Sequence, residues 1–434
     1  MDRISNLTDD LLLKIVSSLP TKHVVATMLL SNRWKSIWTM LPKLDFDYGS
    51  DLEPSQYGKF IKYVDRSLVL NRAPVLETLK FKVGPYCSSE DLVTWIRIGM
   101  VRHFRELEIS ERTVNYDSKI VLPKSLYTYA KPEVLKLIYV SVLDVPDDYC
   151  FPSLKTLLHL VCVTYGTDAS YRKILSSCPV LEEFVLDKTE NCFFMTSFSV
   201  DMPALQRLSI RDRCDTSVHD RDGGVHTVVI NAPSLKYLNF VDFCGDLCLS
   251  GNMPEVVVAN VDVIYESAPK LLECLSSSVK RLSLYLSKTT FTHRFGFDHL
   301  LHLVLCGGTP QWWDLMVWLL ETSPKLQVLK ICSASNDGTC GILSIDEWGE
   351  PRSVPECLMF HLHTFKCEYF EIRDDETKLV EYILENARLL KTACITVENW
   401  NSEIERSDKI DELVSIRRAS SSCQLTLNGE KLVQ

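Results

Sequence analysis

A short apolar pattern recurs along most of this chain and constrains its fold more than any other feature. One apolar residue is followed three positions later by a second, and two positions after that by a third. The copies that follow a proline are Leu76, Leu79, Phe81; Val134, Leu137, Tyr139; Leu181, Phe184, Leu186; Leu205, Leu208, Ile210; Leu235, Leu238, Phe240; and Leu326, Leu329, Ile331. The copies without a proline are Phe104, Leu107, Ile109; Val279, Leu282, Leu284; Leu300, Leu303, Leu305; Leu362, Phe365, Cys367; and Leu390, Ala393, Ile395. The last two apolar residues alternate, as one face of a short strand requires.

The spacing of these copies indicates a repeat protein. They are separated by roughly 20 to 30 residues, which is the period of leucine-rich repeats. Helical patterns precede several of them, over residues 91–102, 311–322 and 377–389. One strand and one helix cannot bury their shared apolar face alone, so successive copies must stack. We therefore predict an α/β fold, a leucine-rich-repeat solenoid with parallel strands on its concave face and helices outside.

Two features make the predicted solenoid irregular. The Asn or Cys that regular leucine-rich repeats place after the strand does not recur at a fixed position, and the period varies. One further copy, after Pro152, runs through Leu154 and Leu157 into His159, where an apolar residue is expected. We expect a solenoid with a short arc.

The N-terminal residues 4–42 predict three short helices that carry a large apolar surface for their size. Thr8 can cap the first helix and Pro20 ends it, while Thr21 and Ser31 can cap the second and third. Each helix has apolar residues at helical spacing. Forty residues cannot bury all of this surface by themselves. Some of it must face a partner or the rest of the chain.

The same segment carries a specific run of residues. The run contains Asp2-Arg3-Ile4-Ser5-Asn6-Leu7, Asp9-Asp10-Leu11-Leu12, Ile15, Ser18-Leu19-Pro20-Thr21-Lys22, Leu30-Ser31, Arg33-Trp34, Trp38 and Leu44-Asp45-Phe46-Asp47. It resembles the F-box in the form common in plants, except that Thr8 stands where the family often has proline. The resemblance implies that this unit docks on a Skp-family adaptor, which is tied to a cullin.

The resemblance also implies which side chains contact the adaptor. They are Leu7, Leu11, Leu12, Ile15, Leu19, Pro20 and Trp34. The alternative for each residue is that it only closes the small three-helix core, and the sequence leaves both interpretations open.

A second resemblance begins near the C-terminal end. The residues that carry it are Trp348, Pro351, Val354-Pro355-Glu356-Cys357-Leu358, Leu362, Thr364-Phe365, Leu379-Val380-Glu381-Tyr382-Ile383-Leu384-Glu385-Asn386-Ala387 and Leu390-Lys391. They resemble the FBD domain that follows the repeats in many plant F-box proteins, and we expect this segment to cap the open end of the solenoid. The predicted division is F-box 1–47, linker 48–70, leucine-rich repeats 71–345 and FBD domain 346–434.

One row of side chains is predicted to line the concave face, because residues between two buried strand positions point the opposite way. The row is Lys80, Glu108, Ile138, Val185, Ser209, Asn239, Ser283, Val304, Lys330 and Lys366. Its polar members, Lys80, Glu108, Ser209, Asn239, Ser283, Lys330 and Lys366, are candidates for binding a protein substrate, since concave solenoid faces are common binding surfaces. Two alternatives remain open: a solvated face with no partner, and binding by loops or by the C-terminal end.

Composition excludes several classes of function. The 434 residues carry 57 acidic and 47 basic side chains, a net charge of −10, which argues against nucleic-acid binding. No run of about 18 apolar residues predicts a membrane span, and the N-terminus lacks the apolar core of a signal peptide. We therefore expect a protein of the cytoplasm, the nucleus or both. Its 16 cysteines are expected to be reduced thiols that pack as small apolar side chains.

Signatures of catalysis and metal binding are missing from the sequence. It has no phosphate-binding loop, dinucleotide-binding turn, hydrolase elbow or zinc-protease helix. Two groups, Cys244 with Cys248 and Cys357-His361-His363-Cys367, have zinc-binding residue types. We predict packing for both, because Cys367 falls on a core strand position and the spacing does not form two ordered pairs. We predict no catalytic residue, no metal and no cofactor.

Three tryptophans near residue 315 might be taken for a platform on which bases stack. Trp312, with Leu315, Met316 and Leu319, instead fits the buried stripe of a repeat helix, and we expect Trp313 to be partly exposed.

The two resemblances together imply a non-catalytic substrate receptor of a Skp–cullin–F-box ubiquitin ligase. The F-box would dock on the adaptor, and the repeats or the FBD domain would present a protein substrate for ubiquitination and proteasomal degradation. The alternatives are a leucine-rich-repeat binding module or inhibitor that acts without a ligase, and a sensor in which a small molecule joins receptor and substrate.

Overall fold

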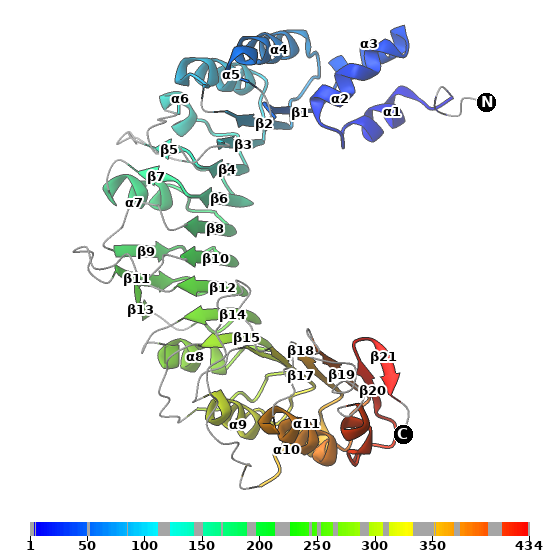
Figure 1. Ribbon diagram of the computed structural model, residues 1–434. Coiled ribbons are helices and arrows are strands. Elements are labelled where there is room, and N and C mark those ends of the chain that lie inside the picture. Colours follow the sequence, from blue (N-terminus) through cyan, green and yellow to red (C-terminus); the bar gives the residue numbers. More distant parts are fainter. Residues whose placement is uncertain are drawn as a thin grey trace. The chain divides into compact units, whose positions relative to one another are not determined.

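The computed structural model divides the chain into two compact units, Met1–Ser209 and Ile210–Gln434. Both units are built from parallel strands and helices (Figure 1). The described residues are 4, 6–49, 53–84, 86–111, 122–142, 151–165, 168–188, 197–212, 226–242, 245–249, 253–263, 268–286, 295–306, 312–332, 351, 353–368, 374–397 and 410–432.

Three short helices open the first unit, as the sequence predicts. They are α1 (Asp9–Val16), α2 (Thr21–Ala26) and α3 (Asn32–Thr39), with a 3-10 turn, η1 (Thr27–Leu29), after α2. Their shared interior contains Val24, Ile37 and Trp38, all of them buried.

The helix starts differ from prediction in one place. Thr8 and Ser31 stand at the N-caps of α1 and α3, although neither side chain makes a capping hydrogen bond. The prediction that Thr21 caps α2 is wrong, because Pro20 holds that position and Thr21 is the first helical residue. The Thr21 hydroxyl instead accepts a hydrogen bond from the backbone amide of Asp45, at 2.7 Å.

A parallel sheet follows in the first unit. Its strands pair in the order β1 (Lys43–Asp47), β2 (Thr78–Val83), β3 (Glu106–Glu111), β4 (Val134–Ile138), β6 (Leu157–Val161) and β8 (Glu183–Lys188). The other strands are β5 (Ser141–Val142), β7 (Thr164–Tyr165), β9 (Ser197–Asp201) and β10 (Arg207–Asp212).

Helices cover one face of this sheet (Figure 1). They are α4 (Tyr57–Leu70), preceded by the 3-10 turn η2 (Pro54–Gln56), α5 (Ser89–Val101), α6 (Lys124–Tyr127) and α7 (Asp168–Ser176). The core lies between the two layers. The Phe81 ring, for example, stacks on Phe46 and on Trp95 with ring centroids 5.6 Å and 5.4 Å away.

The segment predicted as a linker contains a packed helix. α4 is 14 residues long, and it buries Tyr57, Phe60, Val64 and Leu68. The Phe60 ring meets the Trp95 ring of α5 edge to face at 6.1 Å. Residues 57–70 are therefore part of the packed layer of helices and not a flexible connection. The sequence contains this helical spacing, but the strand pattern that marks the other repeats begins only after it.

The second unit repeats the same arrangement. Its main sheet runs in the order β12 (Tyr237–Asp242), β14 (Val258–Val263), β15 (Arg281–Leu286), β16 (His302–Cys306), β17 (Val328–Cys332), β18 (Thr364–Glu368), β19 (Thr392–Thr396), β20 (Gln424–Leu427) and β21 (Glu430–Leu432). These pairs are parallel until β21, which is antiparallel to β20. Another parallel pair is formed by β11 (His226–Asn231) and β13 (Gly245–Leu249). The helices are α8 (Ala268–Ser276), α9 (Trp312–Thr322), α10 (Glu356–Phe360) and α11 (Asp374–Asn386).

The predicted strand pairs are confirmed as core in most copies. Leu79 and Phe81, like Leu329 and Ile331 in the second unit, are buried side by side on their strands. Two copies are displaced from their predicted positions, by two residues in β4 and by one residue in β6. In β4 the buried pair is Leu135 and Leu137 instead of Leu137 and Tyr139, and in β6 it is Leu158 and Leu160 instead of a pair that ends at His159. The β6 copy has one extra residue between Leu154 and its strand, whereas in the β4 copy Val134 already lies in the strand and the buried Pro132 takes the first apolar position.

The predicted C-terminal helix over 377–389 is confirmed as a helix, although α11 begins at Asp374, three residues before the predicted start. Val380, Ile383 and Leu384 are buried on α11, as expected from their spacing. The helix ends at Asn386, three residues before the predicted end.

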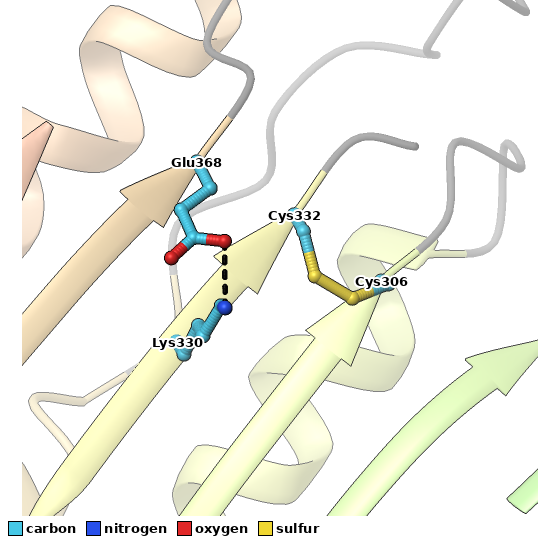
Figure 2. The surroundings of a disulfide bond; sticks show 4 residues. All are labelled: Cys306, Lys330, Cys332 and Glu368. Carbon is cyan, nitrogen blue, oxygen red and sulfur yellow. Dashed lines mark ion pairs between the residues drawn. A yellow bond between two sulfur atoms is a disulfide. The ribbon is translucent and has the colours of Figure 1, made fainter. Parts of the chain in front are cut away.

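The cysteines correct one expectation. Cys306 and Cys332 form a disulfide between β16 and β17, so the prediction of reduced thiols fails for this pair (Figure 2). The two residues face each other directly in the register of the parallel strands. Cys178, Cys357 and Cys423 are buried free thiols, as predicted.

Two tryptophans of α9, Trp313 and Trp318, lie in the core, and the side chain of Trp312 lies outside the described residues. Trp313 is 4% exposed and Trp318 is 9% exposed, so the expected partial exposure of Trp313 is wrong. Within the described residues, no helix is both long enough and apolar enough to cross a membrane.

Candidate interaction surfaces

Helix α1 carries two apolar stripes. Leu12 and Val16 pack into the helical unit, and only 1% and 2% of their surfaces are exposed. Leu11 and Ile15, one residue earlier in each case, are 49% and 54% exposed. A helix needs one apolar stripe to pack against its own domain. The second stripe of α1 is therefore open to a partner.

Exposed apolar side chains continue past α1. Leu29 in η1 is 91% exposed, and its neighbour Leu30 is 69% exposed. We define the N-terminal apolar face as Ile4, Leu11, Ile15, Leu19, Leu29 and Leu30, all of which are exposed. A concentration of large apolar side chains at the surface of a short segment marks a contact with another protein.

The predicted adaptor-binding residues divide between this face and the interior. Leu11, Ile15, Leu19 and Pro20 are exposed, Leu7 and Trp34 are half-buried, and Leu12 is buried. Reasoning from helical stripes did not select Leu29, because the 3-10 turn that carries it has no periodic pattern of its own.

Arg33 ties α3 to the segment that leads into α1. Its Nε lies 2.7 Å from Oδ1 of Asp9, and its guanidinium also donates to the backbone carbonyl of Leu7. The Asp9 side chain is largely exposed, so this ion pair contributes at most about 1 kcal/mol. The contact mainly fixes the position of α1. Leu7 lies two residues before this helix, which carries Leu11 and Ile15, and Arg33 holds it against α3.

A buried asparagine joins the helical unit to the first repeat. The Asn71 amide donates to the carbonyl of Leu41, just after α3, at 2.9 Å. Its Oδ1 accepts from Nη2 of Arg102, at the end of α5, also at 2.9 Å. Nη1 of Arg102 donates to the Asn71 carbonyl at 2.9 Å. These bonds fix the helical unit against the sheet.

Lys80 and Glu108 lie on the face of the first sheet that the helices leave open. The register aligns Asp45, Lys80, Glu108 and Lys136 across β1 to β4. Nζ of Lys80 lies 3.0 Å from Oε2 of Glu108, and Nζ of Lys136 lies 3.1 Å from Oε1 of Glu106. The place beside Glu108 was predicted for Ile138, but the two-residue shift in β4 puts Lys136 there.

The carboxyl groups on this face have pKa values shifted in opposite directions. Burial raises the pKa of Asp45, although the ammonium groups of Lys82 and Lys80 oppose the shift. Burial acts in the same sense on Glu106, but the hydrogen bond and charge of Lys136, together with Lys80, outweigh it and lower its pKa. Neighbouring lysines therefore keep Glu106 ionised, whereas Oδ1 of Asp45 is buried without a hydrogen bond.

The remaining candidates lie farther along the chain. Ser209 is half-buried in β10. In the second unit the register aligns Asn239, Asn260, Ser283, Val304, Lys330 and Lys366 in one row across β12 to β18. Nζ of Lys330 lies 2.6 Å from Oε2 of Glu368, beside the disulfide (Figure 2). Lys366 is exposed, and Asn239 is buried.

The cysteine and histidine cluster near α10 is packed. The Cys357 thiol donates to the Leu320 carbonyl at 3.3 Å, and burial raises its pKa to about 12. Cys367 is buried in β18. Among the described residues, no three His, Cys, Asp or Glu side chains are grouped as metal ligands. Cys244 lies outside the described residues.

A helical unit with an exposed apolar face, followed by stacked strand and helix repeats, defines an F-box protein with leucine-rich repeats. The F-box domain family matches residues 4–46, and the FBD family matches residues 350–395. The leucine-rich-repeat family described as "FBD-associated F-box protein At5g56370, LRR repeats" matches residues 92–253. The chain belongs to the plant family of F-box/FBD/leucine-rich-repeat proteins.

Relatives from Arabidopsis thaliana match along nearly the whole chain. The putative FBD-associated F-box protein At3g50710 is 58% identical, over 99% of this chain and 100% of the relative. The F-box/FBD/LRR-repeat protein At5g56420 is 40% identical, over 98% of each chain. The F-box/FBD/LRR-repeat protein At4g26340 is also 40% identical, over 98% of this chain and 99% of the relative.

Proposed function

We propose that this protein is the substrate-recognition subunit of a Skp–cullin–F-box ubiquitin ligase. The observation that carries the proposal is the N-terminal apolar face, which lies within the F-box match. Leu11 and Ile15 are about half exposed although they are large and apolar. Covering each of them fully would contribute on the order of 1 kcal/mol to association with a partner. The partner is a Skp-family adaptor that is in turn bound to a cullin.

The adaptor contacts come from the exposed and half-exposed members of the predicted set. Leu11, Ile15, Leu19 and Pro20 make the main contact, with Leu7 and Trp34 at its margin. Leu12 supports the contact from inside, because it packs beneath the exposed stripe of α1.

The rest of the chain presents a protein substrate. The F-box takes up residues 1–47, the repeats run to about residue 345 in an irregular solenoid with strands on its concave face, and the FBD domain over 346–434 caps the array. The open-face residues Lys80, Glu108, Ser209, Asn239, Ser283, Lys330 and Lys366 belong to the substrate-binding surface. No residue of this chain performs chemistry in this proposal. The receptor, in the cytoplasm, the nucleus or both, raises the effective concentration of substrate near a ubiquitin-conjugating enzyme held elsewhere in the complex.

Charge placed on the N-terminal apolar face tests the proposal. The double variant Leu11→Asp/Ile15→Asp is compared with Val69→Asp/Val101→Asp, which changes two exposed apolar residues on α4 and α5. Capture of a purified Skp-family adaptor should fall at least about tenfold in the first variant and stay unchanged in the control. Circular dichroism checks that both variants fold.

Two results would reject the receptor. One is a wild-type chain that captures no adaptor under conditions in which another F-box protein does. The other is equal capture by the Leu11→Asp/Ile15→Asp variant. A folded chain without adaptor binding would favour the alternative of a binding module or inhibitor that acts without a ligase.

A further inference from the structure

Backbone hydrogen bonds align one residue from each repeat along an edge of the second unit's sheet. The residue just before each strand donates its amide to the carbonyl of the equivalent residue one strand earlier. The amide of Val257 donates to Lys236 at 2.9 Å, that of Lys280 to Val257 at 2.9 Å, and that of Lys391 to His363 at 2.8 Å. We call the aligned set the leading row. Its members are Lys236, Val257, Lys280, Leu301, Gln327, His363 and Lys391.

A second row lies beside it on the open face. It consists of Tyr237, Val258, Arg281, His302, Val328, Thr364 and Thr392, which the register places opposite one another on β12 to β19. These side chains point away from the core, because the next residue of each strand, such as Leu282 after Arg281, is buried. The two rows together form a continuous strip along one margin of the sheet.

The strip carries positive charge and no carboxylate. Lys236, Lys280, Arg281 and Lys391 are all exposed, and neither row contains an Asp or a Glu. Among the described residues, no carboxylate forms an ion pair with Lys280, Arg281 or Lys391. Burial, followed by the charge of Arg281, lowers the pKa of His302, which therefore acts as a neutral polar group. Lys280, Arg281 and Lys391, which have no carboxylate partner among the described residues, therefore favour an anionic ligand.

Acidic residues around the strip lie in the turns that lead to it and, four residues farther along the same strands, at Asp262 and Glu368. Glu255 precedes β14 and Asp298 precedes β16, and both are exposed. Lys325 occupies the corresponding turn before β17 and is also exposed. The turns therefore contain both signs of charge, whereas the strip contains one.

The corresponding margin of the sheet in the first unit carries side chains of both charges. Its leading residues, aligned by the same kind of backbone bonds, are Glu77, Arg105, Glu133, Thr156, Glu182 and Gln206, with Lys155 beside Thr156 as the acceptor of the Glu182 amide. Nε of Arg105 lies 3.8 Å from Oε1 of Glu133, and Nζ of Lys155 lies 3.3 Å from Oε1 of Glu182. Since the whole chain has a net charge of −10, a strip with four cations does not follow from composition.

We propose that this strip binds a short, extended protein segment rich in Asp and Glu. Six steps between neighbouring strands, from β12 to β19, at roughly 4.8 Å each give a length of about 29 Å. An extended chain of about nine residues covers that distance at roughly 3.3 Å per residue. If the proposed function holds, this acidic segment belongs to the substrate; the binding site itself does not depend on that function.

The apolar members of the strip favour a polypeptide over a nucleic acid. Val257, Val258, Leu301 and Val328 lie between the cations, and they suit aliphatic side chains interspersed among carboxylates. A nucleic-acid strand carries a phosphate at every nucleotide and needs cations spaced more densely than these.

Fluorescence anisotropy with the full-length chain tests the proposal. The probe is a labelled nine-residue peptide of alternating Glu and Val, compared with the same peptide containing Lys in place of Glu and with a nine-nucleotide single-stranded RNA. The Glu peptide should bind, and binding should weaken as ionic strength rises. Lys280→Glu/Arg281→Glu should weaken it about tenfold or more, and Lys391→Glu severalfold. Lys270→Glu, an exposed lysine on α8 of the same unit, is the matched control and should change nothing.

Four results would overturn the proposal. The first two are the absence of salt-dependent binding of the Glu peptide and equal binding of the Lys peptide. The others are equal binding of the Glu peptide by the folded Lys280→Glu/Arg281→Glu variant and preferential binding of the RNA. Adaptor capture, measured on the same preparations, is independent of these results, because it depends on the N-terminal apolar face. Loss of adaptor capture with intact peptide binding would reject the ligase receptor and leave the acidic-segment site standing.

Discussion

The N-terminal helical unit and the strand repeats use apolar residues in different ways. In α1, Leu12 is buried while its neighbour Leu11 is half exposed, so one short helix serves both its own core and an outer surface. In the repeats, the apolar strand residues such as Leu79 and Phe81 are fully buried, and the open face of the first strands carries lysines and glutamates.

The difference separates two kinds of recognition within one chain. A surface of leucine and isoleucine gives affinity through the area it removes from water. A surface of charged side chains contributes little net affinity but discriminates among partners, since a wrong charge is repelled. The helical unit is thus suited to one constant partner, and the open faces of the repeats to selecting among many.

The sharpest test of this comparison uses neighbouring residues of α1. Leu12→Ala should lower the free energy of unfolding by roughly 2–4 kcal/mol, because it leaves a cavity in a small core. Leu11→Ala should change that free energy by less than about 0.5 kcal/mol and should weaken adaptor capture instead. Urea denaturation of both variants measures the first quantity, and pull-down measures the second. Equal destabilisation by the two substitutions would mean that α1 has no separate outer face.

The junction between the two regions should give the next largest effect. Asn71→Ala leaves the Leu41 carbonyl without its buried donor and removes one of the acceptors of the Arg102 guanidinium, and should cost about 1–3 kcal/mol of stability. Hydrogen exchange should accelerate first around the end of α3. The matched control is Asn386→Ala, whose amide bonds only within its own helix, to the Tyr382 carbonyl at 2.8 Å. A variant as stable as the wild type would show that the helical unit is not fixed through Asn71.

The smallest expected effect lies on the charged face of the repeats. The pKa of Glu106 is lowered in the folded chain, so its ionised form stabilises the fold above its unfolded pKa of about 4.3. This contribution is lost as the pH falls below that value through the folded pKa. Glu106→Gln should therefore remove part of the acid sensitivity of unfolding, by up to about 1 kcal/mol.

Thermal unfolding measured between neutral and acidic pH tests this prediction. The control is Glu77→Gln, an exposed carboxylate without an ion pair among the described residues. An identical pH dependence in the wild type and in Glu106→Gln would rule out a contribution from the contacts of Lys136 with Glu106.

Much of the fold follows from periodicity alone. The alternation of Leu329 and Ile331, or of Leu107 and Ile109, identifies strand core positions without any knowledge of their neighbours, because a strand presents every second residue to one side. Fixed spacing also explains the two displaced copies. Before Leu158 the chain inserts one residue, which a pattern of fixed spacing cannot register. Before Leu135 the first position is held by Pro132, whereas the predicted pattern begins at Val134.

Other features depend on contacts that no local pattern encodes. The pairing of Cys306 with Cys332 requires the register of two strands, and the burial of Trp313 requires the face that α9 turns to the sheet. The strip of Lys280, Arg281 and Lys391 is visible only when residues many positions apart are brought together by the backbone hydrogen bonds of stacked repeats. Sequence periodicity therefore identifies the buried residues, whereas surfaces assembled from several repeats can be recognised only in the structure.

The hydrogen bond from the Asp45 amide to the Thr21 hydroxyl has a consequence for association between copies of this chain. β1 is the first strand of its sheet, and the outer edge of a terminal strand offers unpaired amides on which another chain can add a strand. Asp45 is the middle residue of β1, and α2 occupies its outward amide. The segment proposed to dock on a ligase adaptor thus also protects this end of the sheet from intermolecular strand pairing. Loss of the helical unit would expose an aggregation-prone edge as well as remove the proposed docking surface.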